Sequence, residues 1–257
     1  MRFIKYIFIL FYIMVFSQEK IQTTLLEKQP LKVDVISGTD QSGTIIYIKD
    51  NTLIKENTEL IYNNIQLGDI TSVDLFNPLK INLFYSGFNT AIILDNRLAE
   101  ISNINFNALQ PIRTISHIST GNDNTIWIFN QDLQQLELFD YKTNTNRSTT
   151  LPVEGQVMDL TSDYNFSWLL TDSYLYCFNY FGSLVSKRKN DGYSKLKMYN
   201  QNLLLLKENA MYLWNEESNK TTRIDLPELL INQFFVKNET LYIYSGEHLY
   251  RYQLKNL

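Results

Sequence analysis

"NTIWIFNQDLQQLELFDY", residues 124–141, contains two apolar runs separated by a short polar break. Short runs rich in Ile, Leu, Phe and Trp are typical of β-strands. The break at 130–132 supplies Asn, Gln and Asp, and Asn and Asp readily accept the dihedral angles of a tight turn. This stretch therefore predicts a β-hairpin whose first strand carries Trp127.

The hairpin pattern recurs along the chain at a nearly regular interval. Six residues mark its equivalent positions: Tyr47, Leu83, Trp127, Trp168, Leu204 and Tyr242. Neighbouring members of this set are 36 to 44 residues apart, and a further strand pattern precedes each hairpin and follows most of them. Four strands in a unit of about 40 to 50 residues correspond to one blade of a β-propeller. The sequence therefore predicts an all-β fold, a single six-bladed β-propeller.

The sixth unit needs a fourth strand from elsewhere in the chain. It ends at Leu257 without one, while residues 20–27 read as a strand that precedes the first unit. We expect this N-terminal strand to complete the sixth blade, because closing the circle removes exposed sheet edges. A pair of β-sandwiches is the rival architecture, but it does not explain six units at near-equal spacing.

In this pattern residues 20–257 resemble the β-propeller superfamily, with six blades. The Trp-Asp signature of WD40 repeats and the glycine signature of kelch repeats are absent from the sequence. In its pattern of residues, the segment 68–96 is similar to uncharacterised secreted propeller proteins of Bacteroidota. That resemblance implies an envelope or extracellular protein with no assigned activity, and it carries over no functional residue.

The first 17 residues predict a secretory signal peptide. Arg2 and Lys5 precede an apolar run over 6–16, and Val15 and Ser17 occupy the −3 and −1 positions of a cleavage site. The run is short of the roughly 17 to 25 residues that a membrane-spanning helix needs. We expect a propeller of residues 18–257 that is exported to the periplasm or secreted, with no integral membrane segment after cleavage.

Charge and cysteine content exclude some function classes. The chain has 23 Lys and Arg against 27 Asp and Glu, a net charge of −4, without a basic block, which argues against a nucleic-acid partner. The single cysteine, Cys177, has no partner for an intramolecular disulfide and is expected to be buried in a strand. No phosphate-binding loop, zinc-protease motif, nucleophile elbow or calcium loop is present.

The first strand of each unit is expected to line the central channel. These strands are expected at 32–37, 71–76, 114–119, 156–161, 195–200 and 231–236. Each carries an embedded polar residue at an equivalent position: Asp34, Asp74, His117, Asp159, Lys197 and Gln233. Because side chains alternate between the two faces of a strand, we expect these six to point towards the channel and form a ring, called the polar ring below.

Two interpretations of the polar ring are open. In the functional one it holds an ion or a small polar ligand on the axis, since carboxylates suit calcium and His117 supplies a nitrogen ligand or a base. In the structural one a water-filled channel is simply lined by polar groups, and Lys197 opposes a cation. We favour the structural interpretation, which predicts no cofactor and leaves Ca²⁺ on the axis as the alternative.

Aromatic residues in predicted turns are a second candidate surface. Phe88, Tyr180 and Phe181 could stack on a carbohydrate or anchor a protein partner. As a whole, the sequence predicts a monomeric, non-enzymatic interaction module that binds an envelope protein or peptide. The alternatives are a cation-dependent hydrolase of the lactonase kind, using Asp34, Asp74 and Asp159, and a carbohydrate-binding module.

Overall fold

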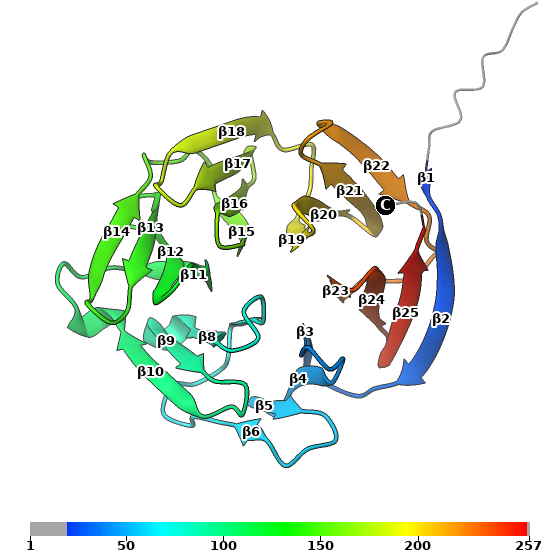
Figure 1. Cartoon of the computed structure of the whole chain (residues 1–257), viewed down its shortest axis with the longest axis horizontal. Coiled ribbons are helices and arrows are strands. Elements are labelled where there is room, and N and C mark those ends of the chain that lie inside the picture. Colours follow the sequence, from blue (N-terminus) through cyan, green and yellow to red (C-terminus); the bar gives the residue numbers. More distant parts are fainter. Residues whose placement is uncertain (1–19, 256–257) are drawn as a thin grey trace, which may run out of the picture.

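The computed structural model describes residues 20–255, which form six β-sheets of four or five strands arranged in a ring around a central axis (Figure 1). In the first four blades the sheet is a meander of four strands that follow one another in the chain, and in the last two an N-terminal strand is added at the outer edge of a meander. The first strand of each meander lies innermost. The predicted six-bladed propeller is confirmed. The predicted signal peptide at 1–17 lies outside the described residues.

The blades follow one another in chain order. The first comprises β3 (Val35–Thr39), β4 (Ile45–Lys49), β5 (Thr52–Lys55) and β6 (Ile61–Tyr62). The second comprises β7 (Ser72–Asp74), β8 (Ile81–Tyr85), β9 (Thr90–Leu94) and β10 (Glu100–Asn105), with short 3₁₀ turns η1 (Ser86–Phe88) and η2 (Phe106–Ala108). The third comprises β11 (Ile115–Thr120), β12 (Thr125–Asn130), β13 (Gln135–Asp140) and β14 (Thr145–Thr149).

The remaining three blades repeat the arrangement. The fourth comprises β15 (Val157–Ser162), β16 (Phe166–Thr171), β17 (Tyr174–Asn179) and β18 (Leu184–Lys189). The fifth comprises β19 (Lys195–Tyr199), β20 (Asn202–Lys207), β21 (Ala210–Asn215) and β22 (Lys220–Ile224), joined by β1 (Lys20–Ile21). The sixth comprises β23 (Gln233–Lys237), β24 (Thr240–Ser245), β25 (His248–Leu254) and β2 (Thr23–Pro30).

The hairpin at 124–141 forms as predicted, with a turn shifted by one residue. β12 and β13 pair from Thr125 opposite Asp140 to Asn130 opposite Gln135. Asn130 still belongs to the strand, and its side-chain oxygen accepts a hydrogen bond from the Asp132 backbone at 3.0 Å. The side chain of Asn130 therefore holds the turn that follows it.

The core is divided among the six junctions between neighbouring blades. Trp127 packs where the third blade meets the fourth, and Trp168 where the fourth meets the fifth, each with 1% of its surface exposed. Cys177 is buried in the same junction as Trp168, as expected, and this burial raises the pKa of its thiol. Large apolar side chains therefore pack neighbouring blades against each other. This packing keeps the ring rigid, with the channel at its centre.

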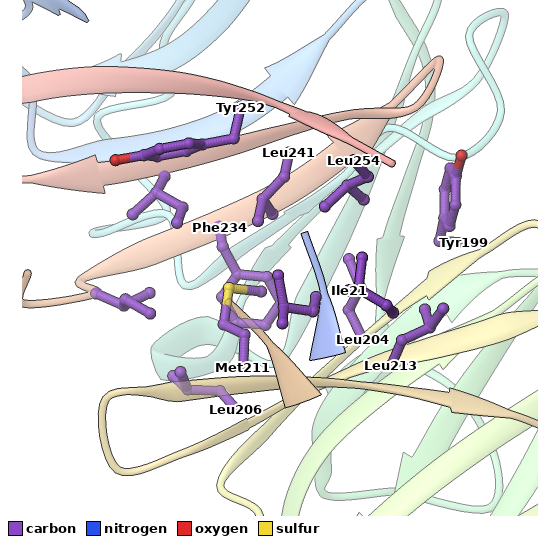
Figure 2. Close-up of a cluster of buried hydrophobic side chains, with 13 residues drawn as sticks. Ile21, Tyr199, Leu204, Leu206, Met211, Leu213, Phe234, Leu241, Tyr252 and Leu254 are labelled. Atoms are coloured by element: carbon purple, nitrogen blue, oxygen red, sulfur yellow. The ribbon is translucent and has the colours of Figure 1, made fainter. Parts of the chain in front are cut away.

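The N-terminal segment closes the ring, as predicted, and adds a contact that was not predicted. β2 pairs antiparallel with β25, from Thr23 opposite Leu254 to Pro30 opposite His248. β1 runs parallel to β22 in the preceding blade, and Ile21 enters the apolar cluster between the fifth and sixth blades (Figure 2). The segment thus ties two blades together rather than one.

No helix within residues 20–255 is both long enough and apolar enough to cross a membrane.

Candidate functional site

A cavity of about 500 Å³ lies in the central channel and is lined by residues of all six inner strands. Pockets that hold small molecules in proteins have volumes of about 300 to 1,000 Å³. Four members of the polar ring line this cavity: Asp74, His117, Asp159 and Lys197. The channel is therefore a recess of ligand size, and part of the polar ring lies in its wall.

The other two ring members lie outside the cavity lining. Asp34 precedes β3, because the inner strand of the first blade begins at Val35 rather than at residue 32. Its carboxylate accepts a hydrogen bond from the Asp50 backbone at 2.7 Å, in a turn of the same blade. Gln233 begins β23, and its side-chain oxygen accepts a hydrogen bond from the Ile36 backbone of the first blade at 2.5 Å.

Asp74 shows the most extensive contacts of any ring member. Its Oδ2 accepts hydrogen bonds from the Thr120 backbone at 2.7 Å and from the Ser119 and Thr120 hydroxyls at 3.0 Å. Its Oδ1 accepts one from the Phe76 backbone at 2.9 Å. The carboxylate of the second blade is thus tied to the inner strand of the third blade.

Asp159 and Gln233 make the same kind of link between other blades. Asp159 Oδ2 accepts a hydrogen bond from the Leu196 backbone of the fifth blade at 3.0 Å. The inner strand of every blade has one edge without a neighbouring strand, so its N–H groups need acceptors from elsewhere. Asp74, Asp159 and Gln233 supply such acceptors to the next blade around the ring, which gives these ring members a structural role.

The link made by Asp74 leads to a stability prediction. Replacing Asp74 with alanine is expected to lower the free energy of unfolding by about 2–4 kcal/mol, because buried donors on Ser119 and Thr120 lose their acceptor. Urea unfolding measures this change. Asp34→Ala is the matched control and is expected to cost less than about 1 kcal/mol, since Asp34 is exposed and its carboxylate bonds to a turn of its own blade. Equal losses in the two variants would contradict the role given to Asp74.

His117 lies half-buried in the cavity wall, beside a serine that sequence reasoning missed. Its Nδ1 is 2.9 Å from the Ser116 hydroxyl oxygen, and Ser116 also lines the cavity. Burial lowers the pKa of His117 below its usual range, while the nearby Asp159 charge and the Met158 backbone raise it in part. The imidazole is therefore neutral at neutral pH and able to accept the serine proton at Nδ1.

A β-bulge explains why these two consecutive residues meet. The pairing of β11 with β12 shifts register between Ile115 and His117, so Ser116 is the extra residue of the bulge. Consecutive side chains of a regular strand point to opposite faces, whereas a bulge re-aims one of them. The stretch Ile115–Ser119 carries no glycine, the residue that most clearly indicates a bulge within a strand.

The lowered pKa of His117 predicts a pH dependence of stability. As the pH falls below about 6.5, His117 binds a proton more readily in the unfolded chain than in the folded protein. The free energy of unfolding therefore falls as the pH falls. The contribution is at most about 1.4 kcal/mol per pH unit. We expect the difference in unfolding free energy between the wild type and His117→Asn to grow with pH up to about 7 and then level off. Parallel curves from pH 5 to 8 would contradict this.

A loop of the second blade contributes Leu75 and Phe76 to the cavity lining and contacts the third and fourth blades. The Lys80 ammonium donates to the Asp123 carbonyl and, at 3.4 Å, to the Asn124 side chain, both in the third blade. The Phe76 ring packs edge-on against the ring of Tyr164 from the fourth blade, with centroids 5.0 Å apart. In the fifth and sixth blades the corresponding turns expose Asn200 and Asn238, which line the cavity.

The three carboxylates proposed for a cation do not gather at one point. Asp34 is outside the cavity lining, and Asp74 and Asp159 accept hydrogen bonds from neighbouring blades. Among residues 20–255, no group of three or more His, Cys, Asp or Glu side chains is arranged to hold a metal ion. Calcium on the axis stays the alternative to the prediction of no cofactor, and elemental analysis of the purified protein is its test.

The candidate aromatic surface is divided between two blades. Phe88 is 49% exposed in the turn that leads into β9, whereas Tyr180 and Phe181, 40% and 65% exposed, lie in the turn that follows β17. These turns lie at opposite ends of the third strands of the second and fourth blades. Tyr180 and Phe181 pack together with ring centroids 4.0 Å apart. The structure therefore does not bring Phe88 to the other two.

The sequence matches no protein-family model and no curated protein sequence. The structure is similar to virginiamycin B lyase from Staphylococcus aureus, with a TM-score of 0.62, 9% identity and coverage of 90% of this chain and 99% of that one. It is also similar to the WD40 domain of Pan2 from Neurospora crassa, with a TM-score of 0.58, 11% identity and coverage of 89% and 75%. A chain of the mitotic checkpoint complex is similar too, with a TM-score of 0.59, 8% identity and coverage of 93% of this chain and 94% of that one. Identities this low show the propeller fold alone, and that fold serves both binding and catalysis.

Proposed function

We propose that this propeller is an exported, non-enzymatic binding module of the cell envelope that receives its ligand in the channel cavity. One observation carries the proposal: a cavity of about 500 Å³ stays open at the axis although Asp74 and Asp159 in its wall are engaged in joining blades. The rigid disc offers its faces to an envelope protein or peptide, and the cavity receives a ligand group.

A cavity-filling variant tests the proposal. Ser72 is exposed and lines the cavity, so Ser72→Trp places an indole in it without entering the core. Ser218→Trp, in the exposed turn between β21 and β22, is the matched control. The three immobilised proteins are incubated with an envelope extract of the producing cells, and the retained molecules are identified by mass spectrometry. We expect at least one component to be retained by the wild type and Ser218→Trp and lost with Ser72→Trp. Identical retention by all three would contradict the proposal.

The exported state gives a separate prediction. The purified mature protein is expected to begin at Gln18, because Val15 and Ser17 are the small residues that precede the cleavage site. Intact-mass measurement and N-terminal sequencing of protein from the periplasm and the medium check this. Ser17→Arg is expected to block cleavage and leave residues 1–17 attached. A cytoplasmic protein that retains residues 1–17 would contradict export.

One observation favours a second function, that of a serine hydrolase. Ser116 and His117 form a hydrogen-bonded pair in the cavity wall, and the Asp159 charge lies near the imidazole. A serine beside a neutral histidine is the arrangement of an activated nucleophile. A fluorophosphonate probe tests it: covalent labelling of Ser116 that is lost in His117→Gln would support the hydrolase. An unlabelled wild-type protein would contradict it.

A further inference from the structure

Two lysines enter the cavity from neighbouring blades. Lys197 lies in the middle of β19, and Lys237 ends β23, and both line the cavity. Within residues 20–255, neither ammonium group forms a hydrogen bond, an ion pair or a cation–π contact. Lys197 occupies a polar-ring position at which Asp74, Asp159 and Gln233 bond to the next blade, yet it makes no such link. Its charge is therefore available to a ligand.

The other ionisable groups of the cavity are already engaged. Asp74 accepts four hydrogen bonds, and Asp159 accepts one from Leu196 and one from Leu160. His117 is paired with Ser116 and is neutral at neutral pH, because burial lowers its pKa. A bound anion consequently meets free donors on the lysines, whereas a bound cation meets carboxylates whose oxygens have donors from the protein itself.

Apolar side chains flank the two lysines on the same strands. Met198 follows Lys197 on β19, and Phe235 and Val236 precede Lys237 on β23, and all three line the cavity. The Phe235 ring is held by stacking on Tyr242, with centroids 4.4 Å apart. Met198, Val236 and Phe235 pack in three successive blade junctions and reach the cavity from there. The fifth and sixth blades therefore present two cations and apolar lining residues in the part of the cavity where Asn200 and Asn238 are exposed.

We propose that the cavity binds a small organic anion, with its anionic group at Lys197 and Lys237 and its apolar body against Met198, Phe235 and Val236. This inference rests on the proposed binding function and names the chemical class of its ligand. The anionic group forms charge-assisted hydrogen bonds with the lysines, and the apolar body leaves water. The volume of about 500 Å³ accommodates a molecule of two or three fused or linked rings, or a short acyl chain.

Two fluorescent probes of the same shape test the anionic part. We would titrate the protein with 8-anilinonaphthalene-1-sulfonate, which carries one negative charge, and with its uncharged analogue N-phenyl-1-naphthylamine. The sulfonate is expected to bind at one site per chain and to be displaced by octanoate but not by octanol. The double variant Lys197→Gln/Lys237→Gln is expected to lose affinity for the sulfonate by about tenfold or more, because charge-assisted hydrogen bonds are removed. Its affinity for the uncharged probe is expected to change less than about twofold, since the apolar contacts remain.

Two further variants locate the site. Lys49→Gln/Lys189→Gln removes two exposed lysines, one of β4 and one of β18, that do not line the cavity. This charge-matched control is expected to bind both probes like the wild type. Ser72→Trp is expected to lower the affinity of the protein for both probes. Circular dichroism and thermal unfolding confirm that each variant is folded.

Each outcome bears on one of the two proposals. Equal binding of both probes that is insensitive to the lysines, but lost in Ser72→Trp, overturns the anionic ligand and leaves the cavity as a binding site. Binding that is unchanged in Ser72→Trp, or no saturable binding of the sulfonate, overturns the inference. The proposed function is overturned only if the wild type, Ser72→Trp and the control variant retain the same molecules from the envelope extract.

Discussion

Replacing Glu137 with alanine is expected to lower the free energy of unfolding by about 3–5 kcal/mol. Glu137 is 1% exposed, and its carboxylate accepts hydrogen bonds from Arg113 Nε at 2.8 Å and from the Asn130 and Asn146 side-chain amides at 2.7 and 2.8 Å. The Arg113 guanidinium is itself buried, over the ring of Phe139. Removing the carboxylate leaves an uncompensated buried cation and two amides without acceptors, which is why the loss is large.

Urea unfolding of two matched variants measures this effect. Glu154→Ala removes a carboxylate that is 68% exposed and 2.7 Å from the Lys187 ammonium, and is expected to cost less than about 1 kcal/mol. The double variant Arg113→Met/Glu137→Leu removes both charges and is expected to be more stable than Glu137→Ala. Similar losses in Glu137→Ala and Glu154→Ala would contradict the burial argument.

A protein that lacks residues 1–30, rather than only residues 1–17, is expected to show no cooperative unfolding transition. The expected loss of unfolding free energy is about 5 kcal/mol or more, which is comparable with the whole stability of a domain. The shorter protein lacks β1 and β2, so the edge of β25 is open and Tyr252 and Leu254 lose their cover. It also loses Ile21 from the cluster between the fifth and sixth blades (Figure 2). An exposed strand edge beside uncovered apolar side chains promotes aggregation.

Thermal unfolding followed by circular dichroism, together with size-exclusion chromatography, checks this expectation. The protein that begins at Gln18 is the first control and is expected to unfold cooperatively as a monomer. Leu25→Ser/Leu26→Ser is the second control, because both side chains are about half exposed, and its effect is expected to stay within about 1 kcal/mol. A protein beginning at residue 31 that unfolds with an unchanged midpoint would contradict the closing role of β2.

The number of blades and their strand order could be predicted because they depend on local patterns. The hairpin at 124–141 and its five counterparts each combine apolar runs with turn residues, and both properties act within a few residues. Closure by the N-terminal segment followed from the missing fourth strand of the sixth unit. The parallel contact of β1 with β22 was missed, because two residues such as Lys20 and Ile21 carry no periodic signal.

The candidate site was predicted in part. Asp74, His117, Asp159 and Lys197 line the cavity as expected, whereas Asp34 and Gln233 lie outside its lining. We expected the side chains of each inner strand to alternate between a face that packs in the core and a face that points into the channel. In a propeller both faces of an inner strand meet neighbouring blades, and only its edge faces the axis. Alternation therefore decides which neighbouring blade a side chain meets, as Asp74 bonded to the third blade shows.

The sequence by itself determined the repeat, the hairpins and the residue types that would stand near the axis, because these follow from periodicity and turn chemistry over short distances. Only the tertiary structure decided which polar side chains are engaged and which are free. Asp74 and Lys197 occupy corresponding places in the repeat, yet the first bonds to the next blade and the second enters the cavity without a partner in the described chain. The difference depends on what the adjacent blade offers at that point, and adjacent inner strands are about forty residues apart in the chain. The free charge of Lys197 and the bulge that joins Ser116 to His117 are therefore properties of the assembled ring.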